Sequence, residues 1–454
     1  MAKGNVHQVA RDDEDMEARV DARGQQPSAY GPQRDSQSDP APGDGAEVDE
    51  ADAPDPRPMS ASSRRGLDWL VFFVADVQTG FGPFVAVFLT TQKWTQVDIG
   101  LVLTIGGLVS LIGQIPLGAL VDRIRPVRVT IAVTLIVIAI CALAFAIWPV
   151  FPVVVASRVA HAAASCVLGL AIVSLSVRLA RADQISGRLG RNAAFASAGT
   201  GIAAAVMGVL GYYFSSQAVF LLAGALVAPA LIALSRIRPE EISAPTAAVR
   251  PPDCGGRAGS VVQLLRCRPL IILAACVTLF HLANAAMLPL AASILTMRSA
   301  ESATAMVAAA MVVPQLTVVL LSTQVGRLAQ RWGRRPLLII GFAALALRGV
   351  LFATTSDPGL LVAIQILDGV SAAVLGVIVP LVIVDVAHAS GHFNLAQGAV
   401  GCAMGLGASV STTLAGFAAD NFGSYTAFGM LAAIAGAGLL AVLLAMPETR
   451  PQSR

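Results

Sequence analysis

Twelve apolar stretches dominate the chain after residue 65, and each is long enough to form a membrane-spanning helix. A helix needs roughly 20 apolar residues to cross the hydrocarbon core of a bilayer. The runs are long and do not alternate between polar and apolar residues, which favours helices over the strands of a membrane barrel. The sequence therefore predicts an all-α membrane protein with spans at 67–90, 98–121, 128–148, 152–178, 194–214, 217–236, 269–295, 303–325, 337–355, 359–385, 395–418 and 425–446.

Composition agrees with a membrane location and argues against several other classes. Only 13% of the residues are charged, whereas soluble domains carry about 25%. The five histidines and six cysteines show no metal-binding spacing, and no glycine loop is followed by the lysine of a nucleotide-binding motif. We therefore expect no metal, no cofactor, no ATP drive and no enzymatic activity.

Two polar segments divide the chain into domains. Residues 1–65 hold half of the 28 acidic residues and few aliphatic ones, a composition that cannot bury enough surface to fold. A second polar stretch, rich in proline and glycine, separates the sixth span from the seventh. The predicted organisation is a disordered acidic cytosolic tail (1–65), a six-helix bundle (66–236), a cytosolic linker (237–268), a second six-helix bundle (269–447) and a short cytosolic tail (448–454).

The loops between the spans predict the orientation. Seventeen arginines lie in loops that are cytosolic if the N-terminus is inside, whereas only Lys93 and Arg298 lie in the opposite loops. Basic residues are enriched in the cytoplasmic loops of membrane proteins. We therefore expect both termini in the cytosol.

The two predicted bundles are related by an internal repeat. The sequence Gly118-Ala-Leu-Val-Asp122-Arg123 closes the second span, and Gly326 begins a similar stretch 208 residues later. The Pro-Glu pair that begins at Pro239 recurs at Pro447 with the same offset. Landmarks at one repeated offset indicate two parallel halves, an arrangement typical of secondary transporters.

These motifs carry a resemblance to a known family. The loop after the second span, and its copy Gly326-Arg-Leu-Ala-Gln330-Arg331-Trp-Gly333-Arg334-Arg335, resemble the signature loop of the major facilitator superfamily. The stretch Ser157-Arg158-Val-Ala-His161 resembles the basic fourth-span motif of its proton-coupled drug antiporters. The copies depart from the family pattern at Arg125-Pro126 and at Gln330, which replaces an acid. The resemblance implies twelve helices in two pseudo-symmetric bundles that work by alternating access.

The signature loops predict a gate at the cytosolic face. A glycine lets a helix end approach its neighbour closely, and Asp122 can accept hydrogen bonds from a helix N-terminus or pair with a basic residue. Such a polar latch would hold the halves together and release when the gate opens; the alternative is that the arginines only set the orientation. The expected gate residues are Gly118, Asp122, Arg123, Gly326, Arg331, Gly333 and Arg334.

Ionisable residues inside the spans predict the functional site, because such groups are costly in a membrane and usually functional. They fall on matched positions of the two halves, with offsets of 207 or 208. In the family, spans one, four, seven and ten line a central cavity, so the resemblance places these side chains together. The expected cavity residues are Asp76, Arg158, His161, His281, Asn284, Gln365 and Asp368.

The chemistry expected of this cavity is proton exchange. Asp76 or Asp368 would be ionised while paired with Arg158 and would take a proton when that pair breaks, with His161 as a relay. A cationic substrate would bind the two acids, and an anionic one would bind Arg158 and His161. Arg348 in the ninth span is expected to be structural, near the outer surface.

The sequence thus favours a secondary transporter for proton-coupled efflux of a small organic molecule. Import of a small metabolite or anion with protons is the alternative, and a transporter-like sensor or scaffold is the alternative from another class. The resemblance, together with usage rich in Ala and Arg and poor in Lys, suggests the cytoplasmic membrane of a bacterium. We expect a monomer whose partners are a small-molecule substrate, protons and the lipid bilayer, and not nucleic acid.

Overall fold

The structure is a computed structural model that describes residues 59–80, 84–124, 126–242, 267–298, 303–387 and 392–450. Every regular element in these ranges is an α-helix or a short 3-10 helix, and no strand occurs within them. Most of the predicted acidic tail and of the predicted linker lies outside the described residues. Those two domain assignments therefore remain predictions.

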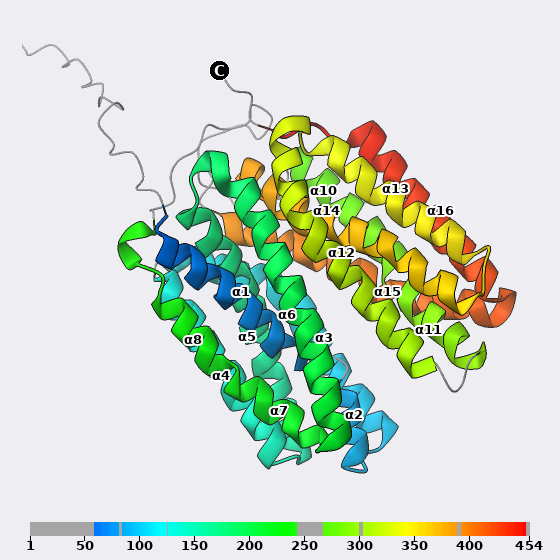
Figure 1. Ribbon diagram of the computed structural model, residues 1–454, viewed down its shortest axis with the longest axis horizontal. Coiled ribbons are helices and arrows are strands. Elements are labelled where there is room, and N and C mark those ends of the chain that lie inside the picture. The colour runs from blue at the N-terminus through cyan, green and yellow to red at the C-terminus, as the bar shows by residue number, and fades with distance from the viewer. Residues whose placement is uncertain are drawn as a thin grey trace, which may run out of the picture. The chain divides into compact units, whose positions relative to one another are not determined.

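The described part of the first half contains eight α-helices and two short 3-10 helices (Figure 1). They are α1 (Ala61–Gly80), α2 (Phe84–Thr91), α3 (Gln96–Arg123), α4 (Val127–Ile147), α5 (Phe151–Leu179), η2 (Ala182–Gln184), α6 (Ile185–Tyr213), α7 (Ser216–Ala225), α8 (Val227–Ser235) and η3 (Pro239–Glu241). The second half contains α10 (Arg268–Asn284), α11 (Met287–Arg298), α12 (Ala303–Trp332), α13 (Arg335–Phe352), α14 (Pro358–Ala387), α15 (Phe393–Phe422) and α16 (Ser424–Ala445).

Eleven helical segments of the described chain are long and apolar enough to cross a membrane, and they coincide with the second to twelfth predicted spans. The first predicted span corresponds to α1 and α2. Helix α1 is less apolar than the others because it carries Arg64, Arg65, Asp68 and Asp76. The short connection between α15 and α16 turns at Gly423, whose φ of 87° is a conformation that a residue with a side chain rarely adopts.

Each half has its own apolar core. In the first half, Leu70, Phe88 and other fully buried side chains pack between α1, α2, α4, α5, α7 and α8. The core of the second half also includes Val177 and Leu189 of the first half. The halves meet where α3 packs on α15 and where α6 packs on α12. These two helix pairs position the functional site.

Candidate functional site

The C-terminal end of α3 is joined to the start of α15 by a carboxylate. Asp122 accepts hydrogen bonds from the backbone and side-chain nitrogens of Asn394, at 2.9 and 2.8 Å, and from the backbone nitrogen of Leu395 at 2.9 Å. The α15 N-terminus has no side-chain cap of its own, so Asp122 satisfies its unpaired N–H groups from the other half. We call this part of the molecule, where α3 and α12 end and α6 and α15 begin, the Asp122 end.

Glycines bring the two halves into backbone contact at the Asp122 end. A Cβ atom on Gly118 would overlap the backbone oxygen of Asn394, and one on Gly398 would overlap that of Gln114. The second helix pair repeats this arrangement 208 residues away, with Gly326 against Ser186 and Gly190 against Ser322. Both crossings are therefore closed at this end, and an added methyl group would force the helices apart.

Replacing Gly398 with alanine is expected to loosen the Asp122 end. The new Cβ would overlap the Gln114 backbone, which cannot move as a flexible side chain can. We expect faster hydrogen–deuterium exchange over residues 392–400 and 114–124 and a lower thermal unfolding midpoint. The matched control is Gly416→Ala on the same helix, where a Cβ would meet nothing within 4 Å and helix propensity alone predicts a slight gain. Equal behaviour of the two variants would contradict the tight crossing.

The second copy of the signature loop makes different contacts. Gln330, which replaces the acid, donates from its side-chain amide to the backbone oxygen of Asp183 in η2. Arg334 forms an ion pair with Asp385 at 2.8 Å, with both side chains buried. The Glu448 carboxylate accepts a hydrogen bond from the backbone N–H of Arg334, with 2.8 Å between the nitrogen and Oε1.

The remaining expected gate residues are one buried glycine, Gly333, and two exposed arginines. Gly333 has a φ of 92°, and a Cβ there would overlap the carboxylate of Glu448. Arg123 and Arg331 are exposed. Of the expected gate residues, Gly118 and Gly326 therefore lie at the helix crossings, and Asp122 and Arg334 make polar contacts. Arg123 and Arg331 lie on the surface.

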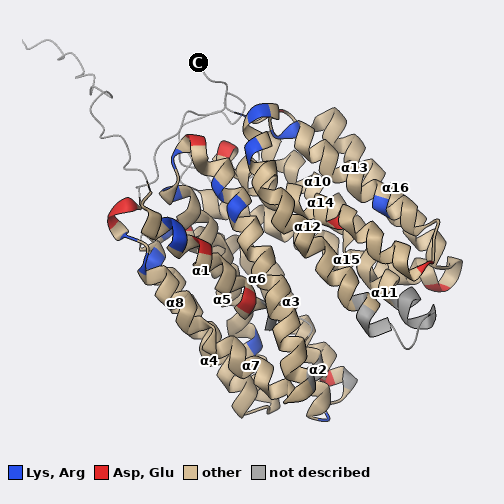
Figure 2. Ribbon diagram, viewed as in Figure 1, with Lys and Arg blue, Asp and Glu red and all other residues tan. Residues whose placement is uncertain are grey.

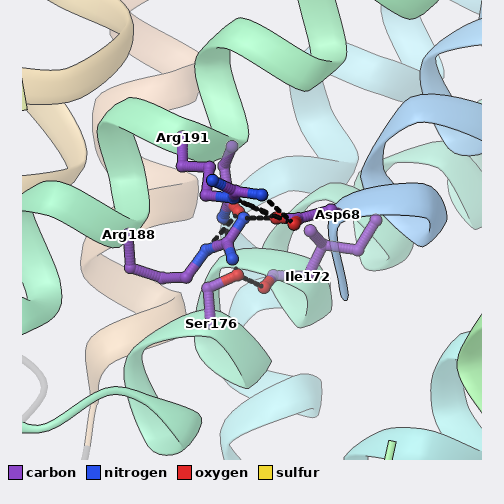
Figure 3. Close-up of polar contacts among 6 residues, drawn as sticks. Asp68, Ile172, Ser176, Arg188 and Arg191 are labelled. Carbon is purple, nitrogen blue, oxygen red and sulfur yellow. Dashed lines mark hydrogen bonds and ion pairs between the residues drawn. The ribbon is translucent and has the colours of Figure 1, made fainter. Parts of the chain in front are cut away.

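A buried ion cluster on α1 and α6 also lies at the Asp122 end (Figure 3). The carboxylate of Asp68 accepts hydrogen bonds at 2.6 Å from both Arg188 and Arg191. Arg188 also donates to Asn192 at 2.9 Å, and Asn192 donates to Ser176 at 2.7 Å. Asp68 stands close to the start of the first predicted span, yet its side chain is only 2% exposed. It lies inside the bundle because two arginines of α6 surround it.

A cavity of about 670 Å³ lies between the halves, within the size range of small-molecule sites. No Asp, Glu, Lys or Arg is among the residues that line it, and Figure 2 shows few charged positions along the middle of the described helices. The polar side chains on its wall are Ser110, Gln114, Ser165, His281, Asn284 and Gln397. Two of their buried atoms, Nε2 of His281 and Oε1 of Gln397, have no hydrogen-bond partner within the described structure. They are available to a ligand.

A charge network lies behind Asn284 in the second half. The Arg348 guanidinium donates to Asn284 at 2.5 Å, to Asp368 at 2.7 Å and to Gln365 at 2.7 Å. Arg348 comes from α13 and is 1% exposed, so its side chain is held inside the bundle by these three partners instead of extending to the surface. Asp368 is paired with this arginine rather than with Arg158.

The ionisable residues of the first half lie apart from that network. His161 is buried and lies 3.3 Å from Ser165, which lines the cavity. The side chain of Arg158 packs over Gly106 of α3, where a Cβ would overlap it. Asp76 is 4% exposed, and its Oδ1 has no hydrogen-bond partner among the described residues.

The seven expected cavity residues are thus divided in the structure. His281 and Asn284 line the cavity, and Gln365 and Asp368 join Asn284 around Arg348. Asp76, Arg158 and His161 are not among the lining residues. Sequence reasoning missed Arg348 as part of this group; the signal that could have found it is an arginine within a span, which is costly unless a partner is near.

Comparison with known proteins decides the family. The family model of the Major Facilitator Superfamily matches residues 68–313 and 274–454. The chain belongs to the major facilitator superfamily. It is also 35% identical over 389 residues to two uncharacterised MFS-type transporters from strains of Mycobacterium tuberculosis, covering 85% of this chain and 93% of theirs. The crystal structure of the MFS transporter FucP in the outward conformation resembles this chain with a TM-score of 0.64 and 16% identity, over 84% of this chain and 98% of FucP.

Family membership confirms the fold class and the kind of protein predicted from the sequence. The chain has the helical major facilitator fold and is a multi-pass membrane protein. It is a secondary transporter rather than an enzyme. Members of this superfamily bind small-molecule substrates and sit in the lipid bilayer, and both statements extend to this chain.

Proposed function

We propose that this transporter exports a small organic molecule in exchange for protons, by alternating access between its two halves. The observation that carries the proposal is a cavity lined by uncharged residues, some of which contact ionisable side chains that do not line the cavity themselves. Ser165 connects the cavity to His161, and Asn284 connects it to Arg348 and Asp368. Substrate and proton sites are therefore adjacent without being the same.

The cavity supports an uncharged substrate region rather than the cationic or anionic one considered from the sequence. Charged substrates need opposite charges on the wall, because desolvating an unpaired charge is expensive. The described wall offers amides, hydroxyls, one imidazole and many apolar side chains. A molecule with an apolar body and a few hydrogen-bonding groups fits this wall best.

Coupling would operate through hydrogen bonds that the substrate competes for. Asn284 has one amide oxygen, and this oxygen accepts from Arg348. A substrate that draws Asn284 toward the cavity weakens the hydrogen bond between Asn284 and Arg348. The ion pair between Arg348 and Asp368 changes as a result. Asp76 is the second candidate proton carrier, since a carboxyl group with an unpartnered oxygen can exchange a proton without breaking an ion pair.

Export is supported by the resemblance of the Arg158–His161 segment to the drug antiporters, and import with protons remains the runner-up. We place both termini in the cytosol on the grounds of the basic loops. The resemblance and the usage rich in Ala and Arg and poor in Lys support a bacterial cytoplasmic membrane, and we expect the protein to act as a monomer. The Asp122 end is then the cytosolic end. The closed crossings there correspond to a state in which the cytosolic gate is shut.

The function is tested by proton flux in proteoliposomes that contain a pH dye, with an imposed pH gradient and a panel of uncharged, cationic and anionic compounds. We expect an uncharged compound to provoke proton movement. Asp368→Asn and Asp76→Asn should reduce that movement to the protein-free background, because neither amide can carry the proton. Asp420→Asn, an exposed carboxylate on α15, is the matched control. Proton movement that both buried variants retain would contradict the proposed coupling.

A further inference from the structure

The pseudo-symmetry of the Asp122 end is broken at one position. In the first signature loop, Asp122 supplies a carboxylate to the N-terminus of α15. The equivalent residue 208 positions later is Gln330, and the equivalent helix is α6. Gln330 donates to a backbone oxygen of η2 instead of accepting from α6, and the residue before α6 makes no side-chain cap. Among the described residues, the α6 N-terminus therefore has no carboxylate cap of the kind that Asp122 gives to α15.

A pocket of about 300 Å³ lies at this N-terminus, between α1, α6 and α12. Four arginines line it: Arg64 of α1, Arg188 and Arg191 of α6, and Arg327 of α12. The acidic residue on its wall is Asp183, whose side chain is 74% exposed and lies 3.9 Å from Arg181. Gln184, Gln330, Gly187 and Gly326 also line the pocket. The four arginines outnumber the two nearby carboxylates, which are Asp183 and the buried Asp68 that Arg188 and Arg191 share. The wall is therefore basic.

One buried group on this wall is left without a partner. Arg188 is 5% exposed, and its Nη1 is buried with no hydrogen-bond partner in the described structure. Its other two nitrogens are occupied by Asp68 and Asn192. A buried charged donor without an acceptor is costly. An anion in the pocket would satisfy it.

We propose that this pocket binds a phosphate group, either free or as the headgroup of an anionic lipid. The phosphate takes the place that a carboxylate at position 330 would occupy and faces the α6 N-terminus, where backbone N–H groups and the helix dipole favour an anion. Arginine forks match phosphate oxygens well. Arg188 and Arg191 belong to the first half and Arg327 to the second, so the bound anion holds the halves together at the Asp122 end.

The proposal is tested on the full chain by thermal unfolding in detergent, with sodium phosphate compared with sodium chloride at equal ionic strength. Phosphate should raise the unfolding midpoint by mass action. Arg327→Gln should raise the half-saturating phosphate concentration about tenfold, the loss expected for one charge-assisted hydrogen bond. Arg236→Gln, an exposed arginine outside the pocket, should leave the response unchanged.

A second variant tests the pseudo-symmetry directly. Gln330→Glu restores a carboxylate beside the α6 N-terminus, so it should raise the midpoint in chloride and abolish the response to phosphate. Unlike Arg327→Gln, this variant is expected to gain stability. A lost phosphate response in a more stable protein cannot be explained by misfolding. A phosphate response that survives in both Arg327→Gln and Gln330→Glu would overturn the site.

The source of the phosphate is decided by a lipid comparison. The same variants are measured in nanodiscs of phosphatidylcholine with and without phosphatidic acid. Stabilisation by phosphatidic acid that the pocket variants lose, without a response to free phosphate, would assign the site to a lipid headgroup. A response to free phosphate assigns it to a soluble anion. No response to either probe refutes the proposal.

Discussion

Replacing Arg348 with methionine is expected to destabilise the protein by about 3–5 kcal/mol, the usual result of removing one partner of a buried ion pair. Arg348 is 1% exposed and donates to three side chains, and Asp368 is its ionic partner at 2.7 Å. Without the guanidinium, the Asp368 carboxylate and two amide oxygens lose their donor. The measurement is unfolding in detergent together with the proton-flux assay, and both should be impaired.

A double variant separates stability from coupling. Removing both charges in Arg348→Met/Asp368→Asn should recover much of the stability, because no buried charge is left unpaired. Proton flux should not recover, since the exchangeable carboxyl group is gone. If the double variant regained flux, Asp368 would not be a coupling group. If it were as unstable as the single variant, the pair would not act as a unit.

The second large effect is expected at Asp68. The side chains of Asp68 and Arg188 are 2% and 4% exposed, with 2.6 Å between Oδ1 and Nη2. Asp68→Ala leaves Arg188 buried without its counter-charge and frees Arg191 from its contact with both carboxylate oxygens. We expect a loss of about 3–5 kcal/mol, measured as a fall in the thermal unfolding midpoint.

Asp183→Ala is the control for this prediction. Asp183 lies at the same end of the bundle, but its side chain is 74% exposed and its contact with Arg181 is 3.9 Å long. Exposed pairs of this kind contribute about 0–1 kcal/mol. If both variants lost a similar amount of unfolding free energy, the ion pairs of Asp68 would contribute no more than an exposed pair does. That result would contradict the prediction.

Sequence reasoning reached the fold because the signals it used are local or periodic. The length of each apolar run predicted eleven of the described membrane helices, and the 208-residue offset predicted two halves. Asp122 was expected to accept hydrogen bonds from a helix N-terminus, and the structure contains such bonds to Asn394 and Leu395. Its role as a gate remains a prediction. The glycines at close helix contacts could be predicted because such contacts require a small residue.

The candidate site was harder to predict, and the reason is geometric. A repeat offset identifies equivalent positions, but it does not say which neighbouring helix a long side chain reaches. Arg348 lies on a helix that the family layout does not place at the cavity, yet its side chain extends to residues of α10 and α14. The pairing of Asp368 with Arg348, rather than with Arg158, follows from that reach.

By itself, then, the sequence determined that this chain is a duplicated helical membrane transporter, because hydrophobic length and repeat spacing are properties of the chain alone. The tertiary structure decided which charges pair, that the described wall of the cavity is neutral, and that one helix N-terminus has a carboxylate partner while its symmetry mate has a basic pocket. These features depend on side chains from helices far apart in sequence. Only the packing of the helices brings them within hydrogen-bonding distance.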